Sequence, residues 1–297
     1  MTKLLQNSVA ANTANVYENA ISIFEKFRYQ YGLVRAWPPT LSDLINFLAF
    51  LAKSNYAPCT ARSYISGISF YLKVRGLHDT TNSFIVKKML SGMQRLSKRC
   101  DCRKPVTLDI LTNIINILPS IALSSYEVRL FAAAFTLAFF AFLRVGEFAD
   151  SGLSKRHALC HDDVLINCNR NLLYVTLHSS KTDQFGHQTK LELSKHDLGL
   201  VCPVLNMVRY LKVRPKIDGL LFCHLNSKPL TRYQVSSMIK KAVRFLGLNE
   251  NDYNTHSFRI GAATSAALMG KSNEEIMDLG RWNSMSFKKY IRLYSFN

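Results

Sequence analysis

Apolar residues recur at intervals of three to four along the first third of the chain. Ile23, Phe24 and Phe27 lie on one face of a predicted helix. Thr40 and Asp43, three positions apart, form a capping-box pattern at the start of another. The spacing predicts four helices, over 13–31, 41–51, 60–74 and 83–96. This part of the chain is therefore expected to be a compact helical unit.

The pattern changes beyond residue 105. Two short runs, 172–177 and 188–193, have the composition of strands, and the polar connection 178–186 between them ends in glycine. The other periodic segments predict helices over 107–118, 126–143, 204–213, 231–246, 257–269, 273–279 and 286–294. The expected fold class is mainly α with a small antiparallel sheet, an α+β fold.

A short polar segment separates these two parts. It holds four basic residues and ends in Pro105. We therefore expect a helical domain over 1–98, a linker over 99–106 and a second domain over 107–297. The basic residues of the segment suit contact with a phosphate backbone, although a solvated linker is an equal alternative; they are Lys98, Arg99, Arg103 and Lys104.

Composition narrows the choice of partner. The chain has 297 residues, a formal charge of +18 and a pI of about 9.7. Such an excess of positive charge is typical of proteins that bind a polyanion, either nucleic acid or an acidic membrane surface. The most apolar run, 131–143, has 13 residues, whereas a membrane-spanning helix needs roughly 20. With no apolar signal-peptide core at the N-terminus, we expect a cytosolic or nuclear protein without a membrane partner.

The seven cysteines do not predict a disulfide framework or a metal site. Their number is odd and their spacing irregular. The densest cluster combines His157, Cys160, His161 and Cys168, and its separations match no standard zinc finger. We expect neither a metal ion nor another cofactor.

Several residues suit chemistry on a phosphodiester. Arginine stabilises the developing charge through two parallel hydrogen bonds and stays protonated. Arg144 follows the apolar run, and Glu147 is near enough to orient it or to pair with it. His256 and Arg259 stand three apart at the start of a predicted helix and so share a face. Taken singly, a helix-end arginine, a capping histidine and a surface arginine explain them as well.

Three further residues complete the set. Lys181, at the tip of the predicted hairpin, can protonate a departing oxygen. The indole N–H of Trp282 can donate to a phosphate oxygen, although a buried core tryptophan is an equal alternative. Tyr290 lies among Lys288, Lys289 and Arg292 and can act as a nucleophile. Tyr294, one helical turn later, is its rival.

In this order, these residues resemble the tyrosine recombinase, or phage integrase, family. The resemblance implies a catalytic set of Arg144, Lys181, His256, Arg259, Trp282 and Tyr290, with Glu147 at an acidic supporting position. The sequence is similar to the Crypton and DIRS recombinases of eukaryotic mobile elements in three motifs, His-Ser-Phe-Arg-Ile-Gly-Ala-Ala-Thr, Leu-Gly-Arg-Trp and Tyr-Ile-Arg. That likeness implies a location in the nucleus, and it covers the first domain more weakly than the second.

Two departures from the family pattern stand out. Arg281 is an extra residue between Gly280 and Trp282, so either side chain could face the phosphate, and we favour Trp282. Only seven residues follow Tyr290, where many relatives carry a helix that docks on a neighbouring subunit. Arg281, Lys288 and Lys289 are also candidates for DNA contact.

The resemblance implies site-specific DNA strand exchange or integration through a 3′-phosphotyrosyl intermediate, without metal or ATP. It further implies a clamp of two domains around double-stranded DNA and a homotetramer on two duplexes. The alternatives are a type IB topoisomerase that relaxes DNA as a monomer, a domesticated DNA-binding protein that has lost catalysis, and, less well supported, a metal-dependent nuclease.

Overall fold

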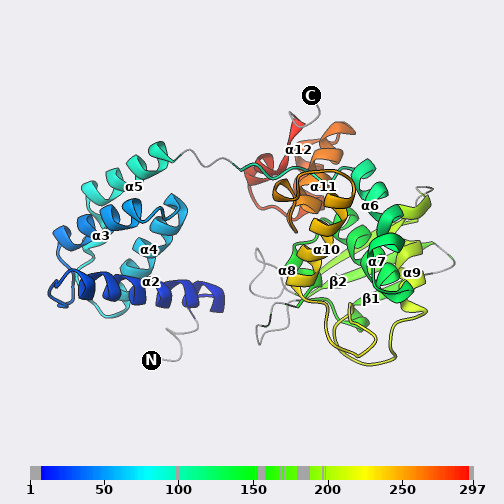
Figure 1. The fold of residues 1–297 in the computed structure, drawn as a ribbon, viewed down its shortest axis with the longest axis horizontal. Coiled ribbons are helices and arrows are strands. Elements are labelled where there is room, and N and C mark those ends of the chain that lie inside the picture. The colour runs from blue at the N-terminus through cyan, green and yellow to red at the C-terminus, as the bar shows by residue number, and fades with distance from the viewer. Residues whose placement is uncertain are drawn as a thin grey trace. The chain divides into compact units, whose positions relative to one another are not determined.

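The computed structural model describes residues 8–97, 101–150, 152, 158–167, 169, 171–178, 188–195, 197 and 199–293. The chain divides into two compact units, Met1–Asp101 and Cys102–Asn297 (Figure 1). Among the predicted site residues, Lys98, Arg99 and Lys181 lie outside the described part, as does the rival nucleophile Tyr294.

The first unit consists of helices α2 (Ala11–Gln30), α3 (Leu41–Lys53), α4 (Pro58–Val74) and α5 (Phe84–Leu96). Their apolar faces enclose one core, in which Phe24, Phe47 and Leu48 are fully buried. Thr40 and Asp43 form the capping box that the sequence predicts at the start of α3. Helix α4 begins two residues earlier than predicted, because Pro58 fits the first helical turn, where its missing N–H is not needed.

The second unit is also mainly helical. Its helices are α6 (Leu108–Ile121), α7 (Ser125–Phe140), α8 (Val145–Phe148), α9 (Pro203–Leu211), α10 (Arg232–Phe245), α11 (Ser257–Leu268) and α12 (Asn273–Gly280). Helix α7 is apolar nearly all round and packs on α6, α9 and α11. The unit therefore forms around a central buried helix.

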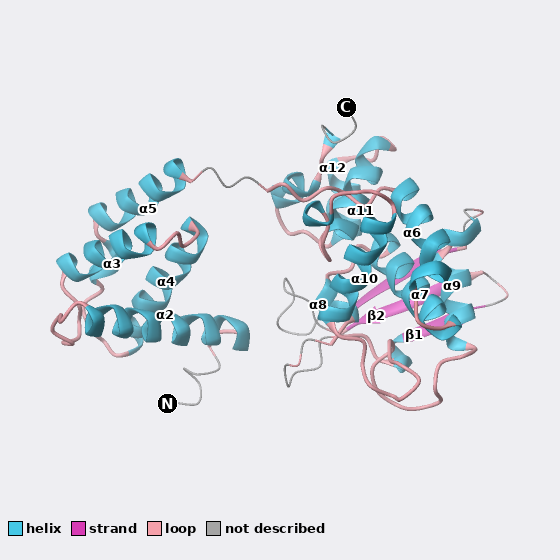
Figure 2. Ribbon diagram, in the orientation of Figure 1, coloured by secondary structure: helices cyan, strands magenta, loops and turns pink. Residues whose placement is uncertain are grey.

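A small antiparallel sheet lies beside these helices (Figure 2). Strands β1 (Val164–Asn167), β2 (Leu172–Leu177) and β3 (Thr189–Ser194) pair in chain order. Alternate residues of β2, namely Leu173, Val175 and Leu177, enter the core of the unit. The predicted fold class is thus confirmed, and β1 is a strand that the sequence pattern did not predict.

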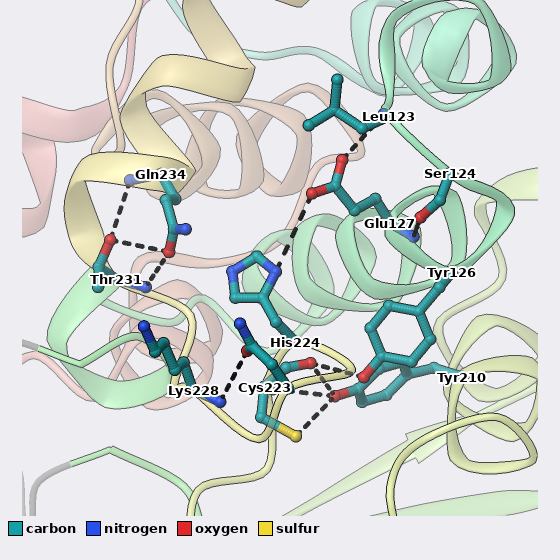
Figure 3. Close-up of polar contacts among 11 residues, drawn as sticks. Leu123, Ser124, Tyr126, Glu127, Tyr210, Cys223, His224, Lys228, Thr231 and Gln234 are labelled. Carbon is teal, nitrogen blue, oxygen red and sulfur yellow. Dashed lines mark hydrogen bonds and ion pairs between the residues drawn. The ribbon is translucent and has the colours of Figure 1, made fainter.

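Two tyrosines connect α7 and α9 to the loop before α10 (Figure 3). The hydroxyl of Tyr126 donates to the carbonyl of Cys223 over 2.6 Å, and that of Tyr210 donates to Leu221 over 3.0 Å. Burial raises the pKa of Tyr126 to about 12, and burial also raises the pKa of Tyr210 above its ordinary value. Both phenols therefore stay neutral and act as fixed hydrogen-bond donors.

Two of the predicted helices near the predicted site differ from the structure. Helix α7 ends at Phe140 rather than at residue 143, because Phe142 has a left-handed backbone with φ 50°. Arg144 consequently precedes α8 instead of ending the apolar helix. The last predicted helix, over 286–294, is within the described residues a 3₁₀ helix, η5 (Met285–Tyr290).

The end of the predicted linker is bound to the second unit. The backbone N–H of Lys104 donates to Asp252 over 2.7 Å, and that of Val106 donates to Ser257 over 2.9 Å. A Cβ on Gly261 of α11 would lie 1.8 Å from the Val106 carbonyl oxygen, so only glycine permits this approach. The chain from Lys104 onwards is therefore part of the second unit.

No helix within the described ranges is long and apolar enough to cross a membrane. The described side chains also include no group of three or more His, Cys, Asp or Glu placed to hold a metal ion. His157 and Cys168 of the zinc alternative lie outside those ranges.

Candidate active site

The carboxylate of Glu147 in α8 connects Arg144, which precedes that helix, to Arg281 at the end of α12. Its Oε1 accepts a 2.9 Å hydrogen bond from Nη1 of Arg144, and its Oε2 accepts one of 2.9 Å from the backbone N–H of the same residue. Arg281 Nη2 donates to Oε2 over 2.9 Å. Glu147 is 4% exposed, so this carboxylate is a buried acceptor shared by two arginines.

Arg259 lies on the first turn of α11 and is also buried, with 1% of its surface exposed. Its Nη1 donates to the Phe142 carbonyl and its Nη2 to the Gly280 carbonyl. A buried guanidinium needs such partners, because desolvating an unpaired charge is costly. The hydrogen bonds thus connect α11 to the ends of α7 and α12.

Aromatic rings cover this guanidinium. The Cζ of Arg259 lies 4.2 Å from the ring centre of Trp282 and 5.8 Å from that of Tyr290. The two rings are themselves 5.2 Å apart. A cation over an indole face is held by the ring quadrupole. Arg259, Trp282 and Tyr290, from three separate segments, therefore form one stack.

Gly280 makes room for the indole. A Cβ at this position would lie 1.6 Å from Cζ3 of Trp282. The two residues are separated only by Arg281, which takes a left-handed conformation with φ 55°. This turn at the end of α12 sends the Arg281 and Trp282 side chains to different partners, Glu147 and Arg259.

Thr264 positions the segment that carries Tyr290, a role that the sequence did not reveal. Its Oγ1 donates to the carbonyl of Tyr290 over 3.2 Å and accepts from the N–H of Arg292 over 3.1 Å. Thr264 lies five residues after Arg259 in the motif that carries the family likeness. The sequence signal that could have found it is a hydroxyl residue within a run of small residues on the same predicted helix as Arg259.

The positive charges outnumber the negative ones in this cluster. The guanidinium groups of Arg144 and Arg281 bind the carboxylate of Glu147, and that of Arg259 lies near enough for the charges of all three to act on it. Burial, and then the charges of Arg144 and Arg281, lower the pKa of Arg259 from 12.5 to about 9. Burial also lowers the pKa of Arg281, and the charge of Glu147 opposes that shift. An anion in this position would relieve the repulsion.

The structure brings together Arg144, Glu147, Arg259, Trp282 and Tyr290. His256 precedes α11, one turn from Arg259, and its backbone N–H donates to Asn254 over 2.8 Å. Its direction towards a substrate remains a prediction, as does the whole role of Lys181, which lies outside the described residues.

The remaining candidates for DNA contact have different surroundings. Lys288 and Lys289 are exposed on η5. Lys104 forms a 3.1 Å ion pair with Asp252. Arg281 does not suit the direct DNA contact that we expected, because its side chain is 9% exposed and its guanidinium faces protein acceptors.

A hollow at the root of the β2–β3 hairpin is a poor candidate for a phosphate site. It is lined by Asp162, Asp163 and Asp218 together with His178 and Cys160. Oδ1 of Asp163 forms a 2.6 Å hydrogen bond with Nε2 of His178. The three carboxylates that line the hollow would repel a phosphodiester, whereas the arginine cluster would attract one.

The chain is similar in sequence to a bacterial integrase/recombinase homologue. No protein-family model matches the chain. The chain is 25% identical over 283 residues to the integrase/recombinase XerD homolog of Selenomonas ruminantium, with 89% of this chain and 76% of that protein covered.

Three solved structures share the fold at lower identity. The Tn1549 transposon integrase in complex with circular intermediate DNA has a TM-score of 0.65 and 13% identity, covering 97% of this chain and 91% of that one. A lambda integrase dimer bound to a COC′ core site has a TM-score of 0.67 and 16% identity, covering 100% and 76%. The XerH recombinase bound to its difH substrate before cleavage has a TM-score of 0.66 and 14% identity, covering 94% and 75%.

Proposed function

We propose that this chain, a homologue of the DNA breaking-and-rejoining enzymes of the tyrosine recombinase or phage integrase family, exchanges DNA strands through a 3′-phosphotyrosyl intermediate. The observation that carries the proposal is the cluster of Arg144, Arg259, Trp282 and Tyr290, in which an excess of positive charge lies beside a phenol. The similar structures named above were determined with DNA, which supports DNA as the substrate class.

Binding of the scissile phosphate falls to the arginines. In the proposed complex, Arg144 and Arg259 donate to its non-bridging oxygens, and the Trp282 indole N–H adds a further hydrogen bond. The Nε of Arg259 is buried and has no hydrogen-bond partner in the described part of the structure. Leaving a buried donor unpaired costs about 1–3 kcal/mol, a cost that an acceptor from the substrate would offset.

The chemical step exchanges one phosphate ester for another. The Tyr290 oxygen attacks phosphorus and its proton passes to His256, while the bond from phosphorus to the 5′ oxygen breaks. Lys181 gives a proton to that leaving oxygen. In the second step a 5′ hydroxyl from another duplex attacks phosphorus, and tyrosine recovers its proton. The ester bond is conserved throughout, so the step requires neither ATP nor a metal ion.

The two units and several copies of the chain act together in this proposal. Both units bind the same duplex, and the linker raises the effective concentration of the second once the first is bound. Four copies on two duplexes give the four active sites that complete exchange needs. The likeness of the motif wording to Crypton and DIRS recombinases carries two finer proposals, a mobile-element origin and action in the nucleus.

A nicked suicide duplex tests the catalytic proposal. Cleavage near the nick releases a short fragment that diffuses away, so the covalent adduct accumulates. The wild-type protein should form the adduct in the presence of EDTA, Tyr294→Phe should retain it, and Tyr290→Phe should lose it. An adduct that survives in Tyr290→Phe would refute the assignment of the nucleophile. DNA binding without any wild-type adduct would instead favour a binding protein.

Strand exchange and relaxation are separated by two further assays with the same preparation. Exchange between duplexes that share the target sequence, with adducts in a complex of four protein chains, supports a recombinase. Relaxation of supercoiled plasmid by a monomer, without exchange, would favour the topoisomerase alternative.

A further inference from the structure

Arg281 has an unusual place for an arginine. It is the C-terminal cap of α12, with φ 55° and ψ 50°, a left-handed conformation that glycine adopts most easily. Its N–H donates to Asp278 over 3.1 Å, so the backbone completes a regular helix end without any help from the side chain. A residue other than glycine in this conformation points to a task for its side chain.

The contacts of that side chain lead to the candidate active site. Nη1 donates to the carbonyl of Ala141 over 3.0 Å, and Nη2 donates to Phe142 over 3.3 Å and to Glu147 Oε2 over 2.9 Å. Nε is buried without a hydrogen-bond partner among the described residues. All of these acceptors belong to the protein, and none lies on an exposed surface where DNA would meet it.

Glu147 links Arg281 to Arg144, because its carboxylate accepts hydrogen bonds from both residues. One of its oxygens binds Nη1 of Arg144, and the other binds both the Arg144 N–H and Nη2 of Arg281. With Arg281 in place, the carboxylate has one orientation, in which Arg144 is held at both its backbone and its side chain. Without Arg281, one oxygen loses a charged donor, and the carboxylate can rotate.

Arg281 also affects Arg259, the other arginine of the stack. Both guanidinium groups donate to the carbonyl of Phe142, the left-handed residue that follows α7. The end of α7 is thus fixed between α11 and α12 by two cations. A single residue therefore connects the two arginines to which the proposed function assigns phosphate binding.

We propose that Arg281 is a positioning residue that orients Arg144 through Glu147 and makes no contact with DNA. This inference rests on the proposed function, because it concerns the rate of the same cleavage step. It predicts that replacing Arg281 slows formation of the phosphotyrosyl adduct while leaving the affinity for intact duplex nearly unchanged.

The test is a double-mutant cycle on adduct formation. Single-turnover rates are measured with saturating nicked suicide duplex for the wild type, Arg281→Met, Glu147→Gln and the double variant. Arg281→Met should lower the rate on the order of 10-fold or more in the wild-type background, and at most about 2-fold in the Glu147→Gln background, because interacting residues are not additive. Equal losses in both backgrounds would mean a merely structural role and would overturn the inference.

Two companion variants keep the test decisive. Arg281→Gly removes the same side chain but suits the left-handed backbone, so it replaces Arg281→Met in the cycle if the latter does not fold. Lys271→Met removes a positive charge from the exposed start of α12 and should match the wild-type rate. A loss in Lys271→Met equal to that in Arg281→Met would assign the effect to net charge and overturn the inference.

Binding provides the readout that separates positioning from DNA contact. Dissociation constants for intact duplex are measured by fluorescence anisotropy over a salt series. Arg281→Met should stay within about 3-fold of the wild type, with the same salt dependence. If Arg281→Met instead binds more weakly, with an unchanged cleavage rate and a salt dependence that corresponds to about one phosphate contact fewer, Arg281 contacts DNA and the inference is wrong. No adduct with the wild type would refute the proposed function itself, whereas a wild-type adduct insensitive to Arg281 would refute this inference alone.

Discussion

Replacing Gly280 by alanine should disrupt the aromatic stack from within. The added Cβ would lie 1.6 Å from Cζ3 and 2.0 Å from Cε3 of Trp282. The indole cannot shift within its present site, because neighbouring rings surround it. The distances between ring centres are 6.2 Å to Phe142, 6.1 Å to Phe287 and 5.2 Å to Tyr290. The ring must therefore leave its place over Arg259.

The expected cost follows from two contributions. Inserting an extra methyl group into a packed core costs about 1–3 kcal/mol. Displacing the indole from Arg259 forfeits roughly 0.5–2 kcal/mol of cation–π attraction. Gly280→Ala should thus lower the unfolding free energy of the second unit by about 1.5–5 kcal/mol and reduce adduct formation on suicide DNA.

Fluorescence can follow this change at one site. The chain has two tryptophans, so in a Trp37→Phe background all indole emission comes from Trp282. Urea unfolding in that background should show a lower midpoint, together with altered native emission. The matched control is Gly92→Ala in α5, where a Cβ meets nothing within 4 Å. This variant should gain about 0.5–1 kcal/mol from the helical preference of alanine, measured by circular dichroism. If Gly280→Ala keeps native Trp282 emission and loses less than about 0.5 kcal/mol, the packing argument is refuted.

The remaining predictions concern pH, the tyrosine segment and the first unit. Because the pKa of Arg259 is lowered to about 9, its charge is lost as pH rises through that value. DNA affinity should fall there in anisotropy titrations, and the fall should be smaller in Arg259→Met; an identical profile would contradict it. The same lowered pKa means that the buried charge costs stability below about pH 9, a cost relieved between there and 12.5. Thr264→Val should lose the bond to the Tyr290 carbonyl, cost about 1–3 kcal/mol in urea unfolding and slow adduct formation; unchanged values would deny its role. Thr40→Ala should destabilise the first unit by about 1 kcal/mol, seen in its Trp37 transition, without slowing cleavage by bound protein.

The long amphipathic helices could be predicted from the sequence because their burial follows a local period. The predicted second helix and its capping box match α3, and the predicted strand over 172–177 matches β2. Strand β1 escaped prediction because four residues are too few to show a period. Helix α8 is equally short, and its existence depends on the left-handed turn at Phe142, which no residue type announces.

The candidate site likewise contains residues that could be predicted from the sequence and contacts that could not. Arg144, Arg259, Trp282 and Tyr290 could be selected because, taken together and in this order, they suit chemistry on a phosphodiester and resemble the motif of the tyrosine recombinase family. The sequence could not show that Arg259 is covered by an indole or that Arg281 turns towards Glu147, since both depend on contacts between separate segments of the chain. The contact between Arg281 and Glu147 was therefore not predicted, and Thr264 was overlooked.

Mapping the residue that becomes joined to DNA tests the central claim most directly. Trypsin cleaves after Lys289 and after Arg292, so the rival tyrosines fall in different peptides, Tyr290-Ile291-Arg292 and 293–297. Adduct formed on suicide DNA is digested with nuclease and trypsin and sequenced by mass spectrometry. The account predicts a nucleotide phosphate on Tyr290 of the shorter peptide. A nucleotide on Tyr294, or on any residue outside this segment, would contradict it.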